Sequence, residues 1–322
     1  MDVLSEVLKA IKLDGALFFN AELSAPWCLR EPRSDEIAPF LSPVGGHVVL
    51  YHYVIEGRLY ARLPGGPRVE LRAGDVVVFP HGNDHFLSYG QPEKPVDALK
   101  TFSKNLSEGL KLARFGGGGE VTRLVCGYLV CEPGLSDLIL SGLPKVLKVS
   151  LSDGPSGRWL ADSIGYMVGE ENGQDAGSGV VMTKLSEVLF METLRRYIGA
   201  LPAEQTGWLA GARDPYVGKA LALIHGEPSE EWTISGLARR VGLSRTRFAE
   251  RFRHFLGDSP IAYLAKWRLK LGADALLSSE NSVAEIGAAV GYGSEASFSR
   301  AFRREFGSPP ATFRRSHRRA LG

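Results

Sequence analysis

The pattern of hydrophobic positions changes near residue 135. Before it, apolar side chains occur in short runs rich in β-branched and aromatic residues, and glycine and proline separate the runs. Such runs are typical of strands. After it, apolar positions recur every three to four residues, which indicates helices. The pattern therefore predicts an α+β chain with a β-rich first part and a helical remainder.

The β-rich part contains several short predicted strands. They are expected at 47–55, 58–63, 68–73 and 75–80, and a further strand pair is expected around 121–132. Many short strands at this spacing are typical of a sandwich or a small barrel. Residues 103–119 end in four consecutive glycines and are predicted to be a loop.

One long amphipathic helix is predicted over 183–201, after a loop at 173–179. Its apolar side chains lie on one broad face. These side chains are Leu185, Val188, Leu189, Leu194, Tyr197 and Ile198. Such a face could pack on the barrel or pair two protomers, and the pattern leaves both open.

An internal repeat marks the C-terminal part. Residues 241–260 align with 290–310, since each begins Val-Gly, continues with Phe-x-x-x-Phe and ends at glycine with proline beyond. A short amphipathic helix precedes each copy, with Thr233 as the predicted N-cap of one and Ser282 of the other. Helix, glycine turn and helix, repeated, predict two helix-turn-helix units at 233–256 and 282–307, joined by a helix over 260–277.

A helical wheel on each second helix separates an apolar anchor from an outer face. Phe248 and Phe298 point inward, and the opposite side mixes arginine, small residues and a few acceptors. Arginine can chelate guanine, glutamate can accept from cytosine, and helix starts can hold phosphate. The candidate DNA contacts are Ser244, Arg245, Thr246, Arg247, Ala249, Glu250 and Arg253, with Ser294, Glu295, Ala296, Ser297, Ser299, Arg300 and Arg303. The alternative is a solvated helix face, which the repetition makes less favoured.

Charge sharpens this division. The whole chain carries a formal charge of +2, but residues 213–322 hold 18 Lys and Arg against 11 Asp and Glu. The basic part is suited to a polyanion partner. There is no apolar run long enough for a membrane span and no signal-peptide pattern, so we expect a cytoplasmic, nucleoid-associated protein. Three cysteines in so long a chain do not form a disulfide scaffold.

The C-terminal part resembles AraC/XylS-type transcription regulators over residues 215–316. The matching residues are Leu237, Ala238, Val241, Gly242, Leu243, Ser244, Phe248, Phe252, Tyr263, Leu264, Arg268, Leu269, Ile286, Val290, Gly291, Tyr292, Phe298, Ser299, Arg300, Ala301, Phe302, Phe306, Gly307 and Pro310. The resemblance implies an activator-type DNA-binding protein whose two recognition helices enter successive major grooves of double-stranded promoter DNA. It also implies RNA polymerase as a partner and a homodimer. Gly287 stands where such proteins often have alanine, which weakens the helix slightly.

The N-terminal part resembles a cupin barrel of the kind that senses an effector. Residues 74–85 match the second cupin motif, whereas the first motif is half present. His52 and Glu56 fit it, but Leu50 occupies the place of its first histidine. The expected domains are therefore 1–201 for sensing and dimerisation, 202–214 as linker and 215–322 for DNA binding.

The effector candidates are His52, Glu56, His85 and Cys126. His52 and His85 could simply hydrogen-bond inside the barrel, with Cys126 as a small buried apolar residue. They could also be a depleted metal site, with Glu56 or Cys126 as a further ligand, although no cofactor is identified. Redox sensing at Cys126 is the third interpretation, because residues 122–127 resemble a subgroup that includes a reactive-chlorine-sensing regulator.

The combined prediction is a sequence-specific transcription regulator, not an enzyme, controlled by a small molecule, a metal or a redox signal. The alternative is a metal-dependent cupin enzyme fused to a DNA-binding module, and Leu50 argues against it. A nucleoid binder without sequence preference is a third class, distinguished by its low specificity over competitor DNA.

Overall fold

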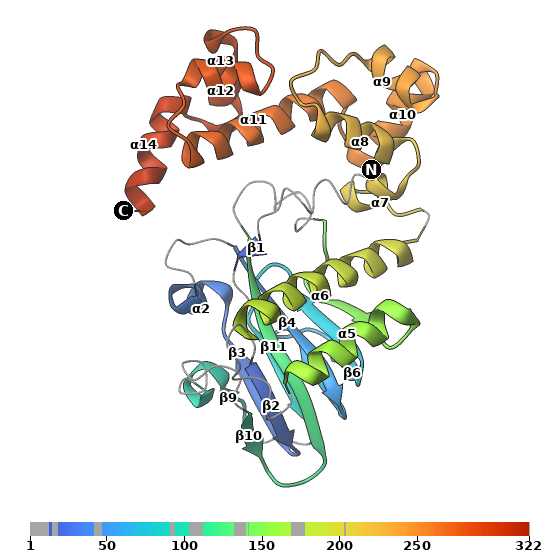
Figure 1. Cartoon of the computed structure of the whole chain (residues 1–322), viewed down its shortest axis with the longest axis vertical. Coiled ribbons are helices and arrows are strands. Elements are labelled where there is room, and N and C mark those ends of the chain that lie inside the picture. The colour runs from blue at the N-terminus through green and yellow to red at the C-terminus, as the bar shows by residue number, and fades with distance from the viewer. Residues whose placement is uncertain are drawn as a thin grey trace. The chain divides into compact units, whose positions relative to one another are not determined.

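A computed structural model describes residues 13–14, 19–41, 47–90, 94–102, 112–131, 140, 142–168, 178–202 and 204–321. They form two compact units, one within residues 13–131 and 143–197 and the other containing 198–322 (Figure 1). The first is built from strands with packed helices, and the second is helical, as the hydrophobic pattern predicted. In the part of the chain that the structure describes, every helix is too short or too polar to cross a bilayer.

The first unit contains two β-sheets. The larger has the order β10–β2–β11–β4–β7–β12, with β1 beside β11. Its strands are β10 (Ala113–Gly116), β2 (Phe19–Ser24), β11 (Val121–Cys131), β4 (His47–Glu56), β7 (Asp75–Phe79), β12 (Leu147–Ser150) and β1 (Leu13–Asp14). The smaller has the order β6–β5–β8–β3–β9. Its strands are β6 (Val69–Arg72), β5 (Arg58–Arg62), β8 (His85–Tyr89), β3 (Trp27–Glu31) and β9 (Val96–Asp97).

The hydrophobic core lies between the two sheets. Alternate residues of each strand enter it, such as Leu50 and Val54 from β4 and Leu59 and Leu87 from the smaller sheet. This alternation follows from the two-residue period of a strand. The predicted cupin-like barrel is therefore a pair of packed sheets that retain edge strands among the described residues.

The strand pair predicted around 121–132 is wrong, because these residues form one continuous strand, β11. Two short strands also lie where none was predicted. β10 falls inside the predicted loop 103–119 and pairs in parallel with Ala21–Ser24 of β2, while residues 103–111 of that loop lie outside the described part. β12 falls in the region read as helical and pairs with β7. Backbone hydrogen bonds hold both strands, and they depend little on side-chain pattern, which explains why the sequence did not show them.

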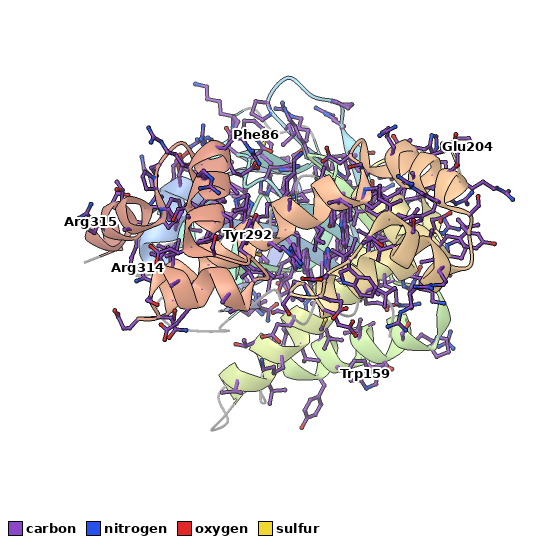
Figure 2. The ribbon with its side chains drawn as sticks, turned by 90° about the horizontal axis from the view of Figure 1, so that it is seen from above. Phe86, Trp159, Glu204, Tyr292, Arg314 and Arg315 are labelled. Carbon is purple, nitrogen blue, oxygen red and sulfur yellow. The ribbon has the colours of Figure 1, made fainter. Side chains whose placement is uncertain are left out.

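Helices α5 (Gly154–Met167) and α6 (Ser178–Ala200) cover the larger sheet (Figure 1). α6 is the predicted amphipathic helix, begun five residues earlier, and residues 173–177 of the loop predicted before it are not described. Leu185 and Leu189 of α6 are buried. The Tyr51 hydroxyl of β4 donates a hydrogen bond to Ser186 Oγ of α6 at 2.7 Å. α6 thus packs on the sheet, while Trp159 of α5 remains exposed (Figure 2). A short helix, α2 (Ser34–Leu41), precedes β4.

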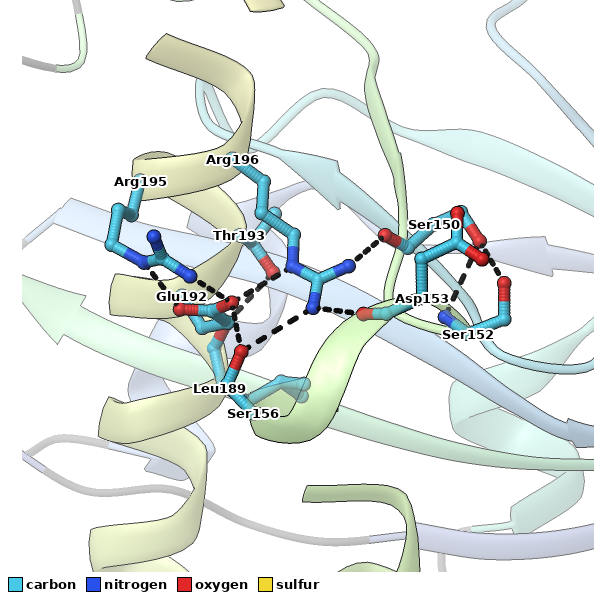
Figure 3. Close-up of polar contacts among 9 residues, drawn as sticks. All are labelled: Ser150, Ser152, Asp153, Ser156, Leu189, Glu192, Thr193, Arg195 and Arg196. Atoms are coloured by element: carbon cyan, nitrogen blue, oxygen red, sulfur yellow. Dashed lines mark hydrogen bonds and ion pairs between the residues drawn. The ribbon is translucent and has the colours of Figure 1, made fainter. Parts of the chain in front are cut away.

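A polar network fixes α6 to its neighbours (Figure 3). Glu192 accepts a hydrogen bond from Ser156 of α5 at 2.8 Å and one from Arg196 Nε at 2.8 Å. Arg196 also donates to the carbonyl oxygens of Ser150 at 2.9 Å and Asp153 at 2.6 Å. Hydrogen bonds to its carboxylate, first from Arg195 and then from Arg196 and Ser156, lower the pKa of Glu192 to about 2. The helix pair is therefore held rigidly on the sheet.

The second unit is a bundle of short helices. They are α7 (Trp208–Arg213), α8 (Val217–Gly226), α9 (Ile234–Val241), α10 (Arg245–Leu256), α11 (Pro260–Ser278), α12 (Val283–Ala289), α13 (Glu295–Phe306) and α14 (Pro310–Leu321). α9–α10 and α12–α13 are the two predicted helix-turn-helix units, and α11 runs between them (Figure 1). α7 lies within the predicted linker and packs on α8 and α10, with Trp208 and Leu209 buried.

The local signals for these helices are present in the structure. The Thr233 hydroxyl accepts from the Gly236 N–H, and Ser282 forms a capping box with Glu285. Gly287 has a packing reason, because a Cβ there would approach Phe298 Cβ to 3.0 Å. A glycine at this position lets α12 and α13 of the second helix-turn-helix unit pack closely. Helix propensity alone does not predict this.

Candidate functional site

Phenylalanine side chains anchor the two second helices, α10 and α13. Phe248 and Phe252 of α10 are fully buried, with ring centroids 5.7 Å apart. Phe298 and Phe302 repeat this in α13 at 5.5 Å. Each pair fixes the rotation of its helix about the helix axis, so the side chains on the opposite face are positioned as well.

A serine begins each of these helices. Ser244 Oγ accepts from the Arg247 N–H, and Ser294 Oγ accepts from the Ser297 N–H. The Ser297 hydroxyl donates to the Ser294 carbonyl at 2.7 Å, so its proton is already used. The remaining N–H groups of each first turn are available to an anion such as phosphate.

Most of the predicted DNA-contact residues lie on the exposed faces of α10 and α13. The exposed ones are Ser244, Arg245, Thr246, Arg247, Glu250, Arg253, Ser294, Glu295, Ala296, Arg300 and Arg303. Ala249, Ser297 and Ser299 are half-buried and lie at the edges of these faces. The buried phenylalanines and the exposed residues therefore lie on opposite sides of each helix, as the helical wheel predicted.

The arginines of these faces are not paired with acids in the part of the chain that the structure describes. None of Arg245, Arg247, Arg253, Arg300 and Arg303 forms an ion pair with a described residue, in contrast to Arg251 of α10, which binds Asp214. Five guanidinium groups without acidic partners among the described residues lie along the exposed faces of α10 and α13, and they form a surface that favours a polyanion. The same groups can make bidentate contacts to guanine.

In the first unit, His52, His85 and Cys126 meet inside the sandwich. They come from β4, β8 and β11, and the strand register places Cys126 opposite His52. His52 Nδ1 lies 2.9 Å from Cys126 Sγ, and His52 Nε2 lies 2.7 Å from His85 Nε2. His85 Nδ1 lies 3.0 Å from the Asn83 carbonyl oxygen. These contacts form one continuous hydrogen-bonded chain.

The proton positions in this chain follow from its last contact. The Asn83 carbonyl can only accept, so His85 carries its proton on Nδ1. Neutral His85 then accepts at Nε2 from the Nε2–H of His52, which leaves His52 Nδ1 to accept from the Cys126 thiol. Burial keeps both imidazoles neutral, since it lowers the pKa of His52 well below its ordinary value and that of His85 to about 3. Burial also raises the pKa of the Cys126 thiol, so the sulfur is protonated.

Glu31 joins this interior cluster, and sequence reasoning missed it. Trp27, Leu29 and Glu31 alternate along β3, and the first two enter the core, so Glu31 faces inward as well. Its register partner on β8 is His85. Burial and the charge of Asp97 raise the pKa of Glu31 to about 7. The signal that could have found it is this alternation, in a segment not read as a strand.

Glu56 does not join the cluster, and Leu50 does not contribute to it. Glu56 ends β4 in an exposed position, four residues from His52, which is about 13 Å along a strand. Leu50 packs in the hydrophobic core. Among the described residues, no three His, Cys, Asp or Glu side chains are arranged to hold a metal ion. The described residues therefore do not fit the metal that a cupin resemblance implies.

Comparison with known families gives two matches. Residues 2–199 match the family described as Cupin, and residues 237–316 match the helix-turn-helix domain family. The chain is similar to the HTH-type transcriptional regulator AlkR of Acinetobacter baylyi, with 26% identity over 98% of this chain and 99% of that one. It is similar to RclR of Escherichia coli, an RCS-specific HTH-type transcriptional activator, with 27% identity over 98% and 97%.

Among solved structures, the DNA-binding domain of AdpA in complex with a target DNA is similar to the C-terminal part. The identity is 30%, over 33% of this chain and 96% of that one, with a TM-score of 0.32.

Proposed function

The chain belongs to the cupin family and carries an AraC-type helix-turn-helix domain, and we propose that α10 and α13 are its two readers of promoter DNA. It is thus a DNA-binding transcription regulator. The observation that supports this role for α10 and α13 is their shared design. Each is anchored by a phenylalanine pair and presents arginines without acidic partners among the described residues.

The roles within each reader follow from position. Arg253, Arg300 and Arg303 lie on the exposed faces of their helices, where arginine can chelate guanine, and Glu250 can accept from cytosine. Ser244 and Ser294, at the helix starts, favour phosphate contacts that set the register on the duplex. The expected partner is double-stranded DNA with two half-sites about one helical turn apart.

The test begins with selection of a binding sequence by the full-length protein from random duplexes. Arg300→Ala should lower affinity for that sequence by about 1–3 kcal/mol and relax the preference at one base position. Arg304→Ala is the matched control, since Arg304 lies off the outer face and should leave every base preference intact. An unchanged affinity and footprint for Arg300→Ala would exclude the assignment of the outer face. Equal binding to all competitor DNA would instead support a nucleoid binder.

We propose that the cupin domain is a sensor rather than an enzyme, with the interior cluster as its effector site. Cys126 and Glu31 are half-buried and lie beside the buried side chains of His52 and His85. A protonated thiol disfavours Cys126 as a ready nucleophile, and the arrangement of the described His, Cys, Asp and Glu side chains disfavours a metal. A small polar effector that replaces one link of the hydrogen-bonded chain is the interpretation these contacts favour. Genome-wide binding with and without candidate oxidants, metals and small polar compounds would identify the signal.

We also propose that the protein acts as a homodimer through the outer side of α5 and α6. Trp159 and Tyr166 lie seven residues apart on one side of α5 and are 55% and 65% exposed. Val180 and Val181, at the start of α6, are exposed as well. The Glu192 network holds these helices rigidly, which favours a preformed interface. In the cytoplasm, bound at a promoter, such a dimer would have RNA polymerase as its partner, in keeping with the activator among its relatives.

A further inference from the structure

Two segments far apart in the sequence touch between the helix-turn-helix units. Gly291 lies in the turn between α12 and α13, and Ser229 lies in the loop between α8 and α9. A Cβ on Gly291 would come within 2.8 Å of Ser229 Cα, so the two backbones are in contact. The φ of Gly291 is +91°, in the region that favours glycine. The turn of the second unit therefore packs on the loop that leads into the first.

Arg268 of α11 binds both segments at this junction. Its Nε donates to the Pro228 carbonyl at 2.6 Å and its Nη2 to the Glu230 carbonyl at 2.8 Å. Its Nη1 donates to the Gly291 carbonyl at 3.0 Å. Two of these acceptors thus belong to the loop before α9, and the third belongs to the turn before α13. A single guanidinium joins the two units.

The chemistry of this contact is specific to arginine. A guanidinium has donors in a fixed planar fork, whereas a lysine ammonium is one point charge on a flexible stem. The half-buried side chain is stretched between three carbonyls, and the added Cβ of a residue larger than Gly291 would also come within 2.8 Å of Arg268 Cζ. The geometry of the junction therefore depends on both Arg268 and Gly291.

A second arginine offers an internal comparison. Arg314 of α14 donates to the carbonyls of Leu276 at 3.0 Å and Asn281 at 2.6 Å. These acceptors lie at the end of α11 and just before α12, so this contact does not reach the first helix-turn-helix unit or the loop before it (Figure 2 labels Arg314). Like Arg268, Arg314 donates to backbone carbonyls through its guanidinium, but it does not join the two helix-turn-helix units.

We propose that Arg268 is a positioning residue that fixes the separation between the two recognition helices and thereby the half-site spacing that the protein accepts. The inference rests on the proposed function, in which both α10 and α13 read DNA. A rigid pair of readers favours one spacing, close to one turn of about 10–10.5 base pairs. If α10 and α13 can move relative to each other, the protein accepts more spacings. It binds each of them more weakly, because conformational entropy is lost when DNA binding fixes the two helices.

The test uses the full-length protein and its selected duplex. One series shifts the half-site separation by up to about two base pairs in each direction, and another scrambles either half-site. We expect Arg268→Lys to bind the optimal spacing about tenfold more weakly and to discriminate less between spacings, while its affinity for each single half-site is unchanged. Arg314→Lys, the matched control, should keep the wild-type spacing profile even if it lowers thermal stability.

Three results would overturn the proposal. The first is an unchanged spacing profile for Arg268→Lys. The second is an equal loss on single and paired half-sites, which would mean that one reader itself is damaged. If Arg268→Lys does not fold, Gly291→Ala disturbs the junction from the other side. The third result is a wild-type spacing profile for Gly291→Ala.

The same duplexes separate this failure from that of the proposed function. If the wild-type protein binds duplexes with a scrambled half-site as tightly as the intact one, dual reading by α10 and α13 is wrong, and the role of Arg268 is wrong with it. If the wild type needs both half-sites but Arg268→Lys behaves identically, the failure belongs to Arg268 alone.

Discussion

Asp214, three residues ahead of α8, binds the guanidinium of Arg251 in α10 through both carboxylate oxygens. Arg251 Nε lies 3.0 Å from Oδ1 and 2.9 Å from Oδ2. The same carboxylate accepts from the backbone N–H groups of Tyr216 and Val217. The Asp214 side chain is 4% exposed and that of Arg251 is 44% exposed. One buried acid therefore ties α10 to the connection between α7 and α8.

Removing this carboxylate should destabilise the protein. We expect Asp214→Asn to lower the free energy of unfolding by about 2 kcal/mol, a value reduced for the partial exposure of Arg251. Urea denaturation of the full chain measures it. The matched control is Asp258→Asn, which breaks the more exposed pair with Lys266 and should cost less than about 1 kcal/mol. Equal losses in the two variants would contradict the special role of Asp214.

The same pair should make stability depend on pH. Burial by itself raises the pKa of Asp214, but the hydrogen bonds from Arg251, Val217 and Tyr216 together lower it below the ordinary value. A lowered pKa means that the stabilisation is complete above the ordinary aspartate pKa of about 3.9 and is lost as pH falls through the folded-state pKa. The stability gap between wild type and Asp214→Asn should therefore be constant above about pH 5 and shrink in acid. A gap that grows in acid would refute this.

Gly272→Ala should destabilise the second helix-turn-helix unit. Gly272 of α11 faces the ring of Phe298, and an added Cβ would come within 2.8 Å of two ring carbons. Alanine normally stabilises a helix interior by about 1 kcal/mol relative to glycine, but overpacking should reverse the sign and cost about 1–3 kcal/mol. Gly165→Ala in α5 is the control, because its methyl group meets no atom within 4 Å and should be neutral or stabilising. Thermal unfolding of both variants gives the comparison.

Cys126 should react slowly in the native protein. Burial, with the charge of Glu31, raises the pKa of its thiol, and only the thiolate attacks an alkylating reagent. At pH 7.5 we expect iodoacetamide to modify Cys126 more than about tenfold slower in the folded protein than in the urea-unfolded chain. Mass spectrometry resolves it from Cys28 and Cys131. If iodoacetamide modified Cys126 equally fast in the folded and the unfolded protein, Cys126 would again be a candidate redox sensor.

The α5–α6 face should control oligomeric state. Trp159→Asp and Tyr166→Asp place charge on an apolar surface, so each should weaken association by at least about tenfold. Sedimentation across a range of protein concentrations measures the monomer fraction. Val121→Asp is the control, because Val121 is also exposed and apolar but lies on β11. A wild-type protein that remains monomeric at high concentration would exclude this interface.

The helical unit was largely readable from the sequence because its determinants are local. A glycine at each turn, a serine at each helix start and a phenylalanine pair four residues apart act within one or two turns, so Phe298 and Arg300 could be assigned to opposite faces. Arg268 shows the limit of this reasoning. Its three acceptors lie 23 to 40 residues away, and the spacing of residues in the chain does not bring them together.

The cupin cluster was readable only in part. His52, His85 and Cys126 stood out as chemistry-bearing residues, but their order in the hydrogen-bonded chain depends on cross-strand register. Register follows from which side of each strand is buried, and a shift of one residue would turn Cys126 away from His52. Glu31 was missed because β3 was not predicted, and β10 was missed because glycine-rich sequence conceals a strand held by backbone bonds alone.

The Asn83 carbonyl oxygen determines which atoms donate and which accept in the hydrogen-bonded chain of His85, His52 and Cys126. The Asn83 oxygen has no proton to give, so it sets the direction of every hydrogen bond up to the thiol. At the far end, His52 consequently presents a lone pair toward Cys126. A molecule that displaces the thiol there must bring its own donor, such as an amine or a hydroxyl group, whereas a carboxylate would meet a like-signed lone pair. A backbone oxygen that lies two hydrogen bonds from His52 thus determines that His52 Nδ1 accepts rather than donates.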